Sequence, residues 1–138
     1  MYLIDTNILS EIRKRKKANK GVQKFFESAV KDEEQLYVSV ITIGELRRGV
    51  ELIRHRGDIR QANQLEKWLE IILTEYGDYI LELDEEIAQL WGKLRSPHHG
   101  HAIDKQIAAT ALIHGLTLVT RNTKDFMKTG VKVLNPFS

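Results

Sequence analysis

Apolar residues gather in five short stretches of strand length, and helical periodicity fills the segments between them. The five stretches are residues 2–4, 36–41, 79–83, 116–119 and 131–134. Between them apolar residues recur every three or four positions, as in Ile103, Ile107 and Ala111, and this last pattern stops at Gly115. Alternating strands and helices predict an α/β domain with a mostly parallel sheet and helices on both faces. We expect 2–4 and 116–119 to be buried central strands and 131–134 to be an edge strand.

The composition is typical of one globular domain. The chain has 138 residues, of which 42% are hydrophobic and 29% charged, so we expect a single domain over 1–138. The lack of cysteine excludes disulfides and thiolate metal sites, fits a reducing compartment and leads us to expect a cytoplasmic protein. No apolar run approaches the roughly 18 residues of a membrane span. Asp5 interrupts the first apolar stretch, which argues against a signal peptide.

Positive charge is clustered, although the formal net charge is only +2. One cluster spans Arg13 to Lys17, and a second includes residues 47–48 and 54–56. Such clusters can contact phosphate or can simply be the solvated face of a helix. Their presence permits a nucleic-acid substrate without requiring one.

Four acidic residues are expected at the carboxyl edge of the sheet, where sites form in open α/β folds. Asp5 ends the first strand, and Glu45 lies in the first turn of the helix after the second. Asp104 lies in the first turn of the helix before the fourth strand, and Asp125 follows that strand. Neutral polar residues accompany these acids: Thr6, Asn7, Thr120 and Asn122.

Each acid also has a purely structural interpretation. Asp5 can cap a helix that begins at Thr6 or Asn7, and Thr42-x-x-Glu45 matches a capping box. Asp104 can complement a helix dipole, and Asp125 can form an Asx-turn. These interpretations explain each residue but not the set, because clustered carboxylates repel one another unless a cation lies between them.

A divalent cation is therefore expected at the acids. Mg²⁺ or Mn²⁺ fits best, since hard cations prefer oxygen ligands, and a carboxylate-held Mg²⁺ suits phosphodiester chemistry. Zinc fits less well because cysteine is absent. The histidines of "PHHGH", His98, His99 and His101, match no structural zinc spacing. We interpret this segment as a polar loop beside the acidic pocket.

Three segments resemble the PIN-domain family: "LIDTNILSEI", "SVITIGELRRGV" and "AIDKQIAATALIHGLTLVTRNTKDF". The likeness is greatest to VapC- and FitB-type toxin ribonucleases of bacterial toxin–antitoxin modules, and it covers nearly the whole chain. The resemblance implies a three-layer α/β/α sandwich with a five-stranded parallel sheet. It also implies Mg²⁺- or Mn²⁺-dependent endonucleolytic cleavage of RNA that leaves a 5′-phosphate and a 3′-hydroxyl.

The resemblance also implies the roles of individual residues and the partners. Asp5, Glu45, Asp104 and Asp125 match the family's catalytic and metal-binding acids, with Thr6, Asn7, Thr120 and Asn122 as supporting polar residues. Such toxins form homodimers, and a cognate antitoxin blocks the acidic pocket and binds promoter DNA. Candidate RNA contacts are the basic residues near the N-terminus and one after the fourth strand, namely Arg13, Lys14, Arg15, Lys16, Lys17 and Arg121.

Two other functions remain open from the sequence alone. A PIN-like module can bind nucleic acid or a protein partner without cutting. Asp at the end of a first strand also occurs in phosphoryl-transfer proteins such as receivers, but the chain has Asn7 instead of a second acid and contains no P-loop.

Overall fold

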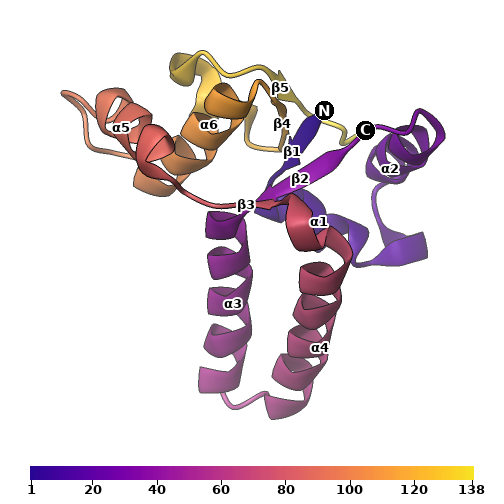
Figure 1. The fold of residues 1–138 in the computed structure, drawn as a ribbon. Coiled ribbons are helices and arrows are strands. Elements are labelled where there is room, and N and C mark those ends of the chain that lie inside the picture. Colours follow the sequence, from indigo (N-terminus) through magenta and orange to yellow (C-terminus); the bar gives the residue numbers. More distant parts are fainter.

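A five-stranded parallel sheet forms the centre of the computed structural model, which describes residues 1–138 (Figure 1). The spatial order is β3-β2-β1-β4-β5, with β1 in the middle. Leu3 pairs with Tyr37 of β2 on one side and with Leu118 of β4 on the other. The strands are β1 (Tyr2–Ile4), β2 (Leu36–Ser39), β3 (Ile80–Leu81), β4 (Thr117–Val119) and β5 (Val133–Leu134). The α/β class, the parallel sheet and the edge position of the last strand are confirmed.

Helices cover both faces of this sheet. They are α1 (Thr6–Ile12), α2 (Lys20–Lys31), α3 (Val40–His55), α4 (Ile59–Tyr76), α5 (Glu85–Leu94) and α6 (Ala102–His114). Single 3₁₀ segments span Arg15–Lys17, Gly77–Tyr79 and Thr123–Thr129. No helix combines the length and the apolar character that crossing a lipid bilayer requires.

Alternation along β1 divides the core into two clusters. Ile4 packs with residues of α1 to α4, whereas Leu3 packs with α6 and with Phe126. Successive strand residues point to opposite faces of a sheet, so adjacent residues of one strand fill both halves of the core. Leu3, Ile4, Leu118 and Val119 are fully buried, which confirms β1 and β4 as central strands.

The second strand ends earlier than its apolar pattern predicts. We expected a strand over 36–41, but β2 ends at Ser39, whose Oγ accepts a hydrogen bond from Ile41 N at 3.0 Å. This N-cap starts α3 at Val40 and places Glu45 in the second turn of the helix, not in the first. The predicted capping box is therefore wrong, and Thr42 is a buried residue inside the helix.

Helices α3 and α4 form a long antiparallel hairpin that extends away from the sheet (Figure 1). Arg47 and Arg54 of α3 both pair with Glu66 of α4, at 2.6 and 3.0 Å, and both also pair with Glu51. These two arginines of the second basic cluster are thus engaged within the protein.

The C-terminal tail packs against the start of α2. Asn19 Oδ1 accepts hydrogen bonds from Gly21 N at 2.9 Å and from Ser138 N at 3.0 Å. A Cβ on Gly21 would lie only 2.1 Å from Pro136 O, so glycine is required by this close approach. The tail and the helix start therefore form one packed unit.

Candidate active site

Asp5 lies at the centre of a polar network where β1 meets α1. Its side chain is only 7% exposed. Oδ1 accepts a hydrogen bond from Thr6 N at 2.8 Å, and Oδ2 accepts from Thr120 Oγ1 at 2.8 Å and from Asn7 Nδ2 at 3.4 Å. The carboxylate is thus the expected N-cap of α1, but the cap uses one oxygen only. The other oxygen links the network to the end of β4.

Thr120 and Asn7 make this link specific. Besides donating to Asp5, Thr120 Oγ1 accepts from Asn7 Nδ2 at 3.2 Å and from Asn122 N at 3.1 Å. Asn7 Oδ1 in turn accepts from Arg121 N at 3.0 Å. Residues separated by more than 110 positions in the sequence are therefore held together by complementary donors and acceptors. Asn122 takes part through its backbone, with no hydrogen bond from its side chain.

Glu45 reaches the same site from α3. Its Oε1 accepts a hydrogen bond from Thr6 Oγ1 at 3.0 Å. The second turn of α3 thereby holds a half-buried carboxylate next to the first residue of α1. Thr6, which we expected to be a supporting polar residue, thus contacts one of the four acids.

Asp104 and Asp125 form a group with a residue that sequence reasoning did not assign. One ligating atom from each of Asp104, Asp125 and His101 lies within 4.8 Å of the others. His101 is the residue before α6, and its Nδ1 lies 3.6 Å from Asp104 Oδ2. Its position three residues before Asp104 at a helix start was the available signal, which the surrounding histidines obscured.

Electrostatic coupling joins this group to Asp5 and Glu45. Burial raises the pKa of Asp5, and the hydrogen bonds from Thr120, Thr6 and Asn7 lower it in part. Burial also raises the pKa of Glu45, and the charges of Asp5 and Asp104 raise it further. The pKa of Asp104 rises through burial and through the charges of Asp5 and Asp125. The four acids therefore repel one another across a shared site.

The donor set fits a hard divalent cation. Carboxylates dominate it, and the 4.8 Å limit of the Asp104, Asp125 and His101 group is a span that one cation covers with ligands about 2.0–2.6 Å away. The raised pKa values show that the charged forms of Asp5, Glu45 and Asp104 are disfavoured in the free protein. A bound cation would offset this free-energy cost. Asp104 and Asp125 are the acids placed to share one ion, while Asp5 and Glu45 border the same space.

Comparison with known proteins identifies the family. The model of the PIN domain matches residues 2–132. The chain is 38% identical to Toxin FitB of Neisseria gonorrhoeae and 31% identical to VapC ribonuclease Y4jK of Sinorhizobium fredii, with 99% of this chain covered in both and 99% and 98% of the relatives. This chain belongs to the PIN-domain family.

Two solved structures agree with this PIN assignment. FitAB bound to an IR36 DNA fragment matches with a TM-score of 0.84 and 36% identity, over 100% of this chain and 96% of that one. A toxin–antitoxin complex from Klebsiella pneumoniae matches with a TM-score of 0.65 and 27% identity, over 100% and 99%. The resemblance to VapC- and FitB-type proteins and the α/β/α fold are thereby confirmed.

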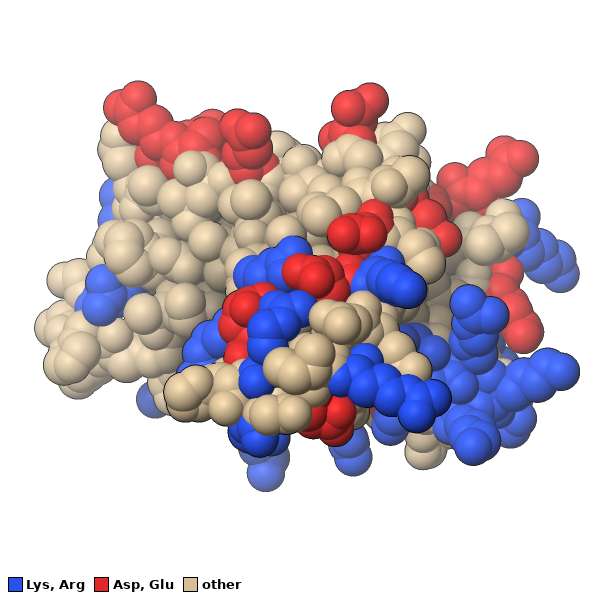
Figure 2. Space-filling model, turned by 90° about the horizontal axis from the view of Figure 1, so that it is seen from below, with Lys and Arg blue, Asp and Glu red and all other residues tan.

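The side chains of the candidate RNA-contact residues form no hydrogen bond or ion pair with the four acids of this PIN domain. Arg13 stacks over Trp68, 5.8 Å from the ring centroid, and Arg121 stacks over Phe137 at 4.6 Å. The segment from Lys14 to Lys17 is exposed and includes a short 3₁₀ turn, not a regular helix face. Lys and Arg side chains gather on one side of the face seen in Figure 2, where few acidic side chains interrupt them.

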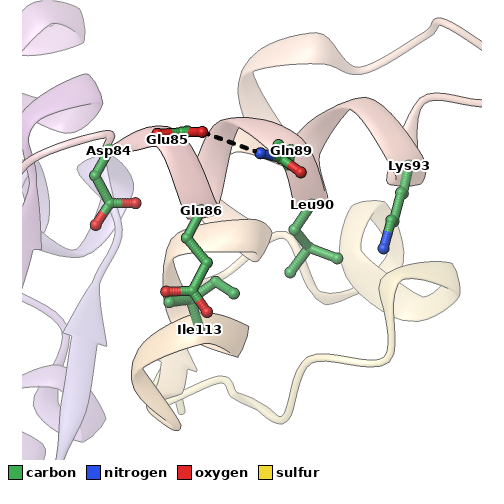
Figure 3. Close-up of a pocket in the computed structure, with 7 residues that line it drawn as sticks. All are labelled: Asp84, Glu85, Glu86, Gln89, Leu90, Lys93 and Ile113. Atoms are coloured by element: carbon green, nitrogen blue, oxygen red, sulfur yellow. Dashed lines mark hydrogen bonds between the residues drawn. The ribbon is translucent and has the colours of Figure 1, made fainter.

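A second acidic surface contains none of the four acids of the PIN site. A cavity of about 580 Å³ is lined by Asp84, Glu85, Glu86, Gln89 and Lys93 of the α5 segment, with Leu90 and Ile113 (Figure 3). Asp84 caps α5 by accepting from Ile87 N at 2.9 Å, and Glu85 accepts from Gln89 Nε2 at 3.4 Å. These contacts explain the acids as helix-start residues.

Proposed function

We propose that this PIN domain is a metal-dependent endoribonuclease, the toxin of a type II toxin–antitoxin module, acting in the cytoplasm. The observation that supports it best is the convergence of Asp5, Glu45, Asp104 and Asp125 from four separate segments, with raised pKa values for the first three. The name of the Sinorhizobium relative as a ribonuclease supports RNA as the substrate.

The four acids divide into two pairs with different tasks in this proposal. Asp104 and Asp125 hold the cation, Mg²⁺ or Mn²⁺, with Asp5 and Glu45 completing the negative wall. Bound there, such an ion polarises a phosphoryl oxygen and lowers the pKa of water. Thr120, Asn7 and Thr6 fix the carboxylates of Asp5 and Glu45 through hydrogen bonds, so that little reorganisation accompanies substrate binding. Water then attacks the phosphorus in line and the bond from phosphorus to the 3′-oxygen breaks. The water oxygen stays on the 5′-phosphate, and a proton released by the water balances the one taken up by the 3′-hydroxyl.

RNA sequencing tests the activity directly. After a short pulse of expression, 5′-phosphate ends should appear at specific positions with the wild type and should be lost with Asp104→Asn. The purified wild type should cut RNA in Mg²⁺ or Mn²⁺ and stop in chelator. RNA binding without any cleavage would instead indicate a silent binding module.

We further propose that an antitoxin covers the site in a homodimeric complex that binds promoter DNA. A small pocket of about 250 Å³ next to Glu45 is lined by apolar residues of α3 and α4, among them Leu46, Val50, Leu65 and Trp68. An apolar antitoxin segment fits this pocket, and the FitAB structure with DNA supports a DNA-binding complex. Co-purification of this chain with the product of the neighbouring small gene, and loss of cleavage in the complex, would support the proposal.

A further inference from the structure

A lysine-lined pocket opens beside Asp125. It lies between the segment that joins α5 to α6 and the 3₁₀ turn Thr123–Thr129. Its volume of about 510 Å³ is within the range of roughly 300–1,000 Å³ for small-ligand sites. Asp125, His101 and apolar residues form part of its lining. Three lysines also line it: Lys105, Lys124 and Lys128. We refer to it as the lysine pocket.

No carboxylate neutralises these lysines in the structure. None of the three forms an ion pair, and only Lys105 has a hydrogen bond, from Nζ to His98 O at 3.0 Å. By contrast, the arginines of the α3–α4 hairpin are paired with glutamates. The three ammonium groups outnumber the one carboxylate of the lining, that of Asp125, so the potential in the cavity is positive and favours an anionic ligand.

The lysine pocket adjoins the proposed metal site. Asp125 and His101 line it, and both belong to the group whose ligating atoms converge with Asp104. A polyanion bound at Asp125 and His101 therefore lies next to the lysines. Negative and positive walls side by side suit a phosphodiester chain, with one phosphate at the cation and another group on the lysines.

Apolar side chains complete the pocket. Met127 is 73% exposed although it follows the fully buried Phe126, and Leu94 lines the pocket as well. An exposed, polarisable thioether offers a surface on which the face of a base can pack. Phosphate-binding cations together with an apolar surface match a nucleotide better than they match a free inorganic anion.

We propose that the lysine pocket binds a nucleotide adjacent to the scissile phosphate of single-stranded RNA. Lys124 and Lys128 contact its phosphate, and Met127 packs against its base. This inference rests on the proposed ribonuclease function and adds the residues that position the substrate.

Steady-state cleavage of a short fluorescent single-stranded RNA tests the pocket. Lys124→Gln combined with Lys128→Gln should raise KM at least tenfold, with a smaller effect on kcat. In the Asp104→Asn background the same pair should weaken RNA binding and reduce the slope of log affinity against log salt by about 0.7, the contribution of the one phosphate that the two lysines contact. Lys31→Gln combined with Lys67→Gln is the matched control, because both lysines are exposed, lack ion pairs and lie on α2 and α4.

Met127→Ser separates the base contact from the phosphate contact. It should weaken RNA binding at every salt concentration without changing the slope, because an apolar contact releases no counterions. Thermal unfolding of the lysine and Met127 variants should match that of the protein in which each is made, since Lys31, Lys67, Lys124, Met127 and Lys128 are all exposed.

The outcomes distinguish the two levels of the proposal. Suppose that the wild type cleaves RNA, and that the Lys124/Lys128 double variant has the same KM and salt slope as the control double variant. This result would overturn the proposal for the lysine pocket but not the ribonuclease function. No cleavage by the wild type with Mg²⁺ or Mn²⁺ would overturn both.

Discussion

Thr120 shows how one hydroxyl organises the acidic site. It is fully buried and contacts Asp5, Asn7 and Asn122. Replacing it with valine would leave Asp5 Oδ2 without its shortest hydrogen bond, a loss of about 1–3 kcal/mol for a buried charged acceptor. The missing donor also raises the pKa of Asp5 further, so uptake of Mg²⁺ should shift to higher pH.

Urea unfolding and calorimetric titration of Thr120→Val with Mg²⁺ at several pH values measure both effects. Thr117→Val is the matched control, since Thr117 begins β4, the strand that Thr120 follows, and has no side-chain hydrogen bond. Equal stability and equal pH dependence in the two variants would contradict the role of Thr120.

The charge of Asp104 lowers the stability of the folded protein to an extent that depends on pH. Because its pKa is raised from 3.8, the folded state binds this proton more tightly than the unfolded chain does. The proton on Asp104 therefore stabilises the folded state. This contribution is fully present below pH 3.8 and is lost as the pH rises through the raised pKa. In chelator, Asp104→Asn should therefore be more stable than the wild type at neutral pH, and the difference should shrink in acid.

Adding Mg²⁺ should reverse the order of Asp104→Asn and the wild type. The ion stabilises only a protein that binds it, so the melting temperature of the wild type rises while that of the variant does not. Asp78→Asn, at an exposed acid without an ion pair, is the control. A wild type that melts at the same temperature with and without Mg²⁺ would argue against a cation at these acids.

Sequence reasoning found the acids but not their full surroundings. Asp5, Glu45 and Asp104 were recognisable from their positions relative to strands and helices. His101 was not, because its approach to Asp104 depends on a left-handed backbone conformation at φ 54°, which no periodicity reveals. The Thr6–Glu45 contact was equally hidden, since it joins two helices 39 residues apart.

At the scale of elements, apolar pattern predicts where strands lie better than where they end. The stretch 36–41 is apolar throughout, yet Ser39 ends the strand by capping a helix. The stretch 79–83 shortens to Ile80–Leu81 because a 3₁₀ turn occupies Gly77–Tyr79. In both places local hydrogen bonding of the backbone competes with a strand that hydrophobicity alone would extend.

The contact between α2 and the C-terminal tail gives a prediction about packing. Gly21→Ala would place Cβ 2.1 Å from Pro136 O and force the tail away, at a cost of about 1–3 kcal/mol. Gly92→Ala, inside α5 with nothing within 4 Å, should instead stabilise by about 0.5–1 kcal/mol. Chemical unfolding, with hydrogen exchange at Phe137 and Ser138, compares the two; a tail that stays protected in Gly21→Ala would contradict the clash.

For the whole molecule, the sequence predicts the class of fold but not the order of its strands. Alternating elements indicate a parallel sheet, whereas the arrangement β3-β2-β1-β4-β5 depends on which crossover lies on which face. The resemblance to PIN domains supplied the three layers and the number of strands, but not their order. That order places the ends of β1 and β4 side by side, which is why Asp5 and Thr120 meet.

The uneven distribution of charge predicts an effect on association rate. The exposed segment from Lys14 to Lys17 adds positive potential without a hydrogen bond or ion pair to the four acids of the site. Lys16→Glu combined with Lys17→Glu should slow the binding of RNA and flatten its salt dependence while leaving affinity for Mg²⁺ unchanged. Stopped-flow association at several salt concentrations measures this; an unchanged salt slope would rule out steering by this segment.

The acids of the site come from both ends of the polypeptide, since Asp5 directly follows the first strand and Asp125 follows the fourth. During synthesis, Asp5 and Glu45 leave the ribosome before Asp104 and Asp125 have been translated. The middle strand β1 cannot pair with β4 until β4 has been synthesised. A growing or truncated chain therefore carries no assembled nuclease centre. In a protein proposed to be a toxin, this arrangement delays any harmful activity until translation is nearly complete, the moment at which a protective partner can also bind.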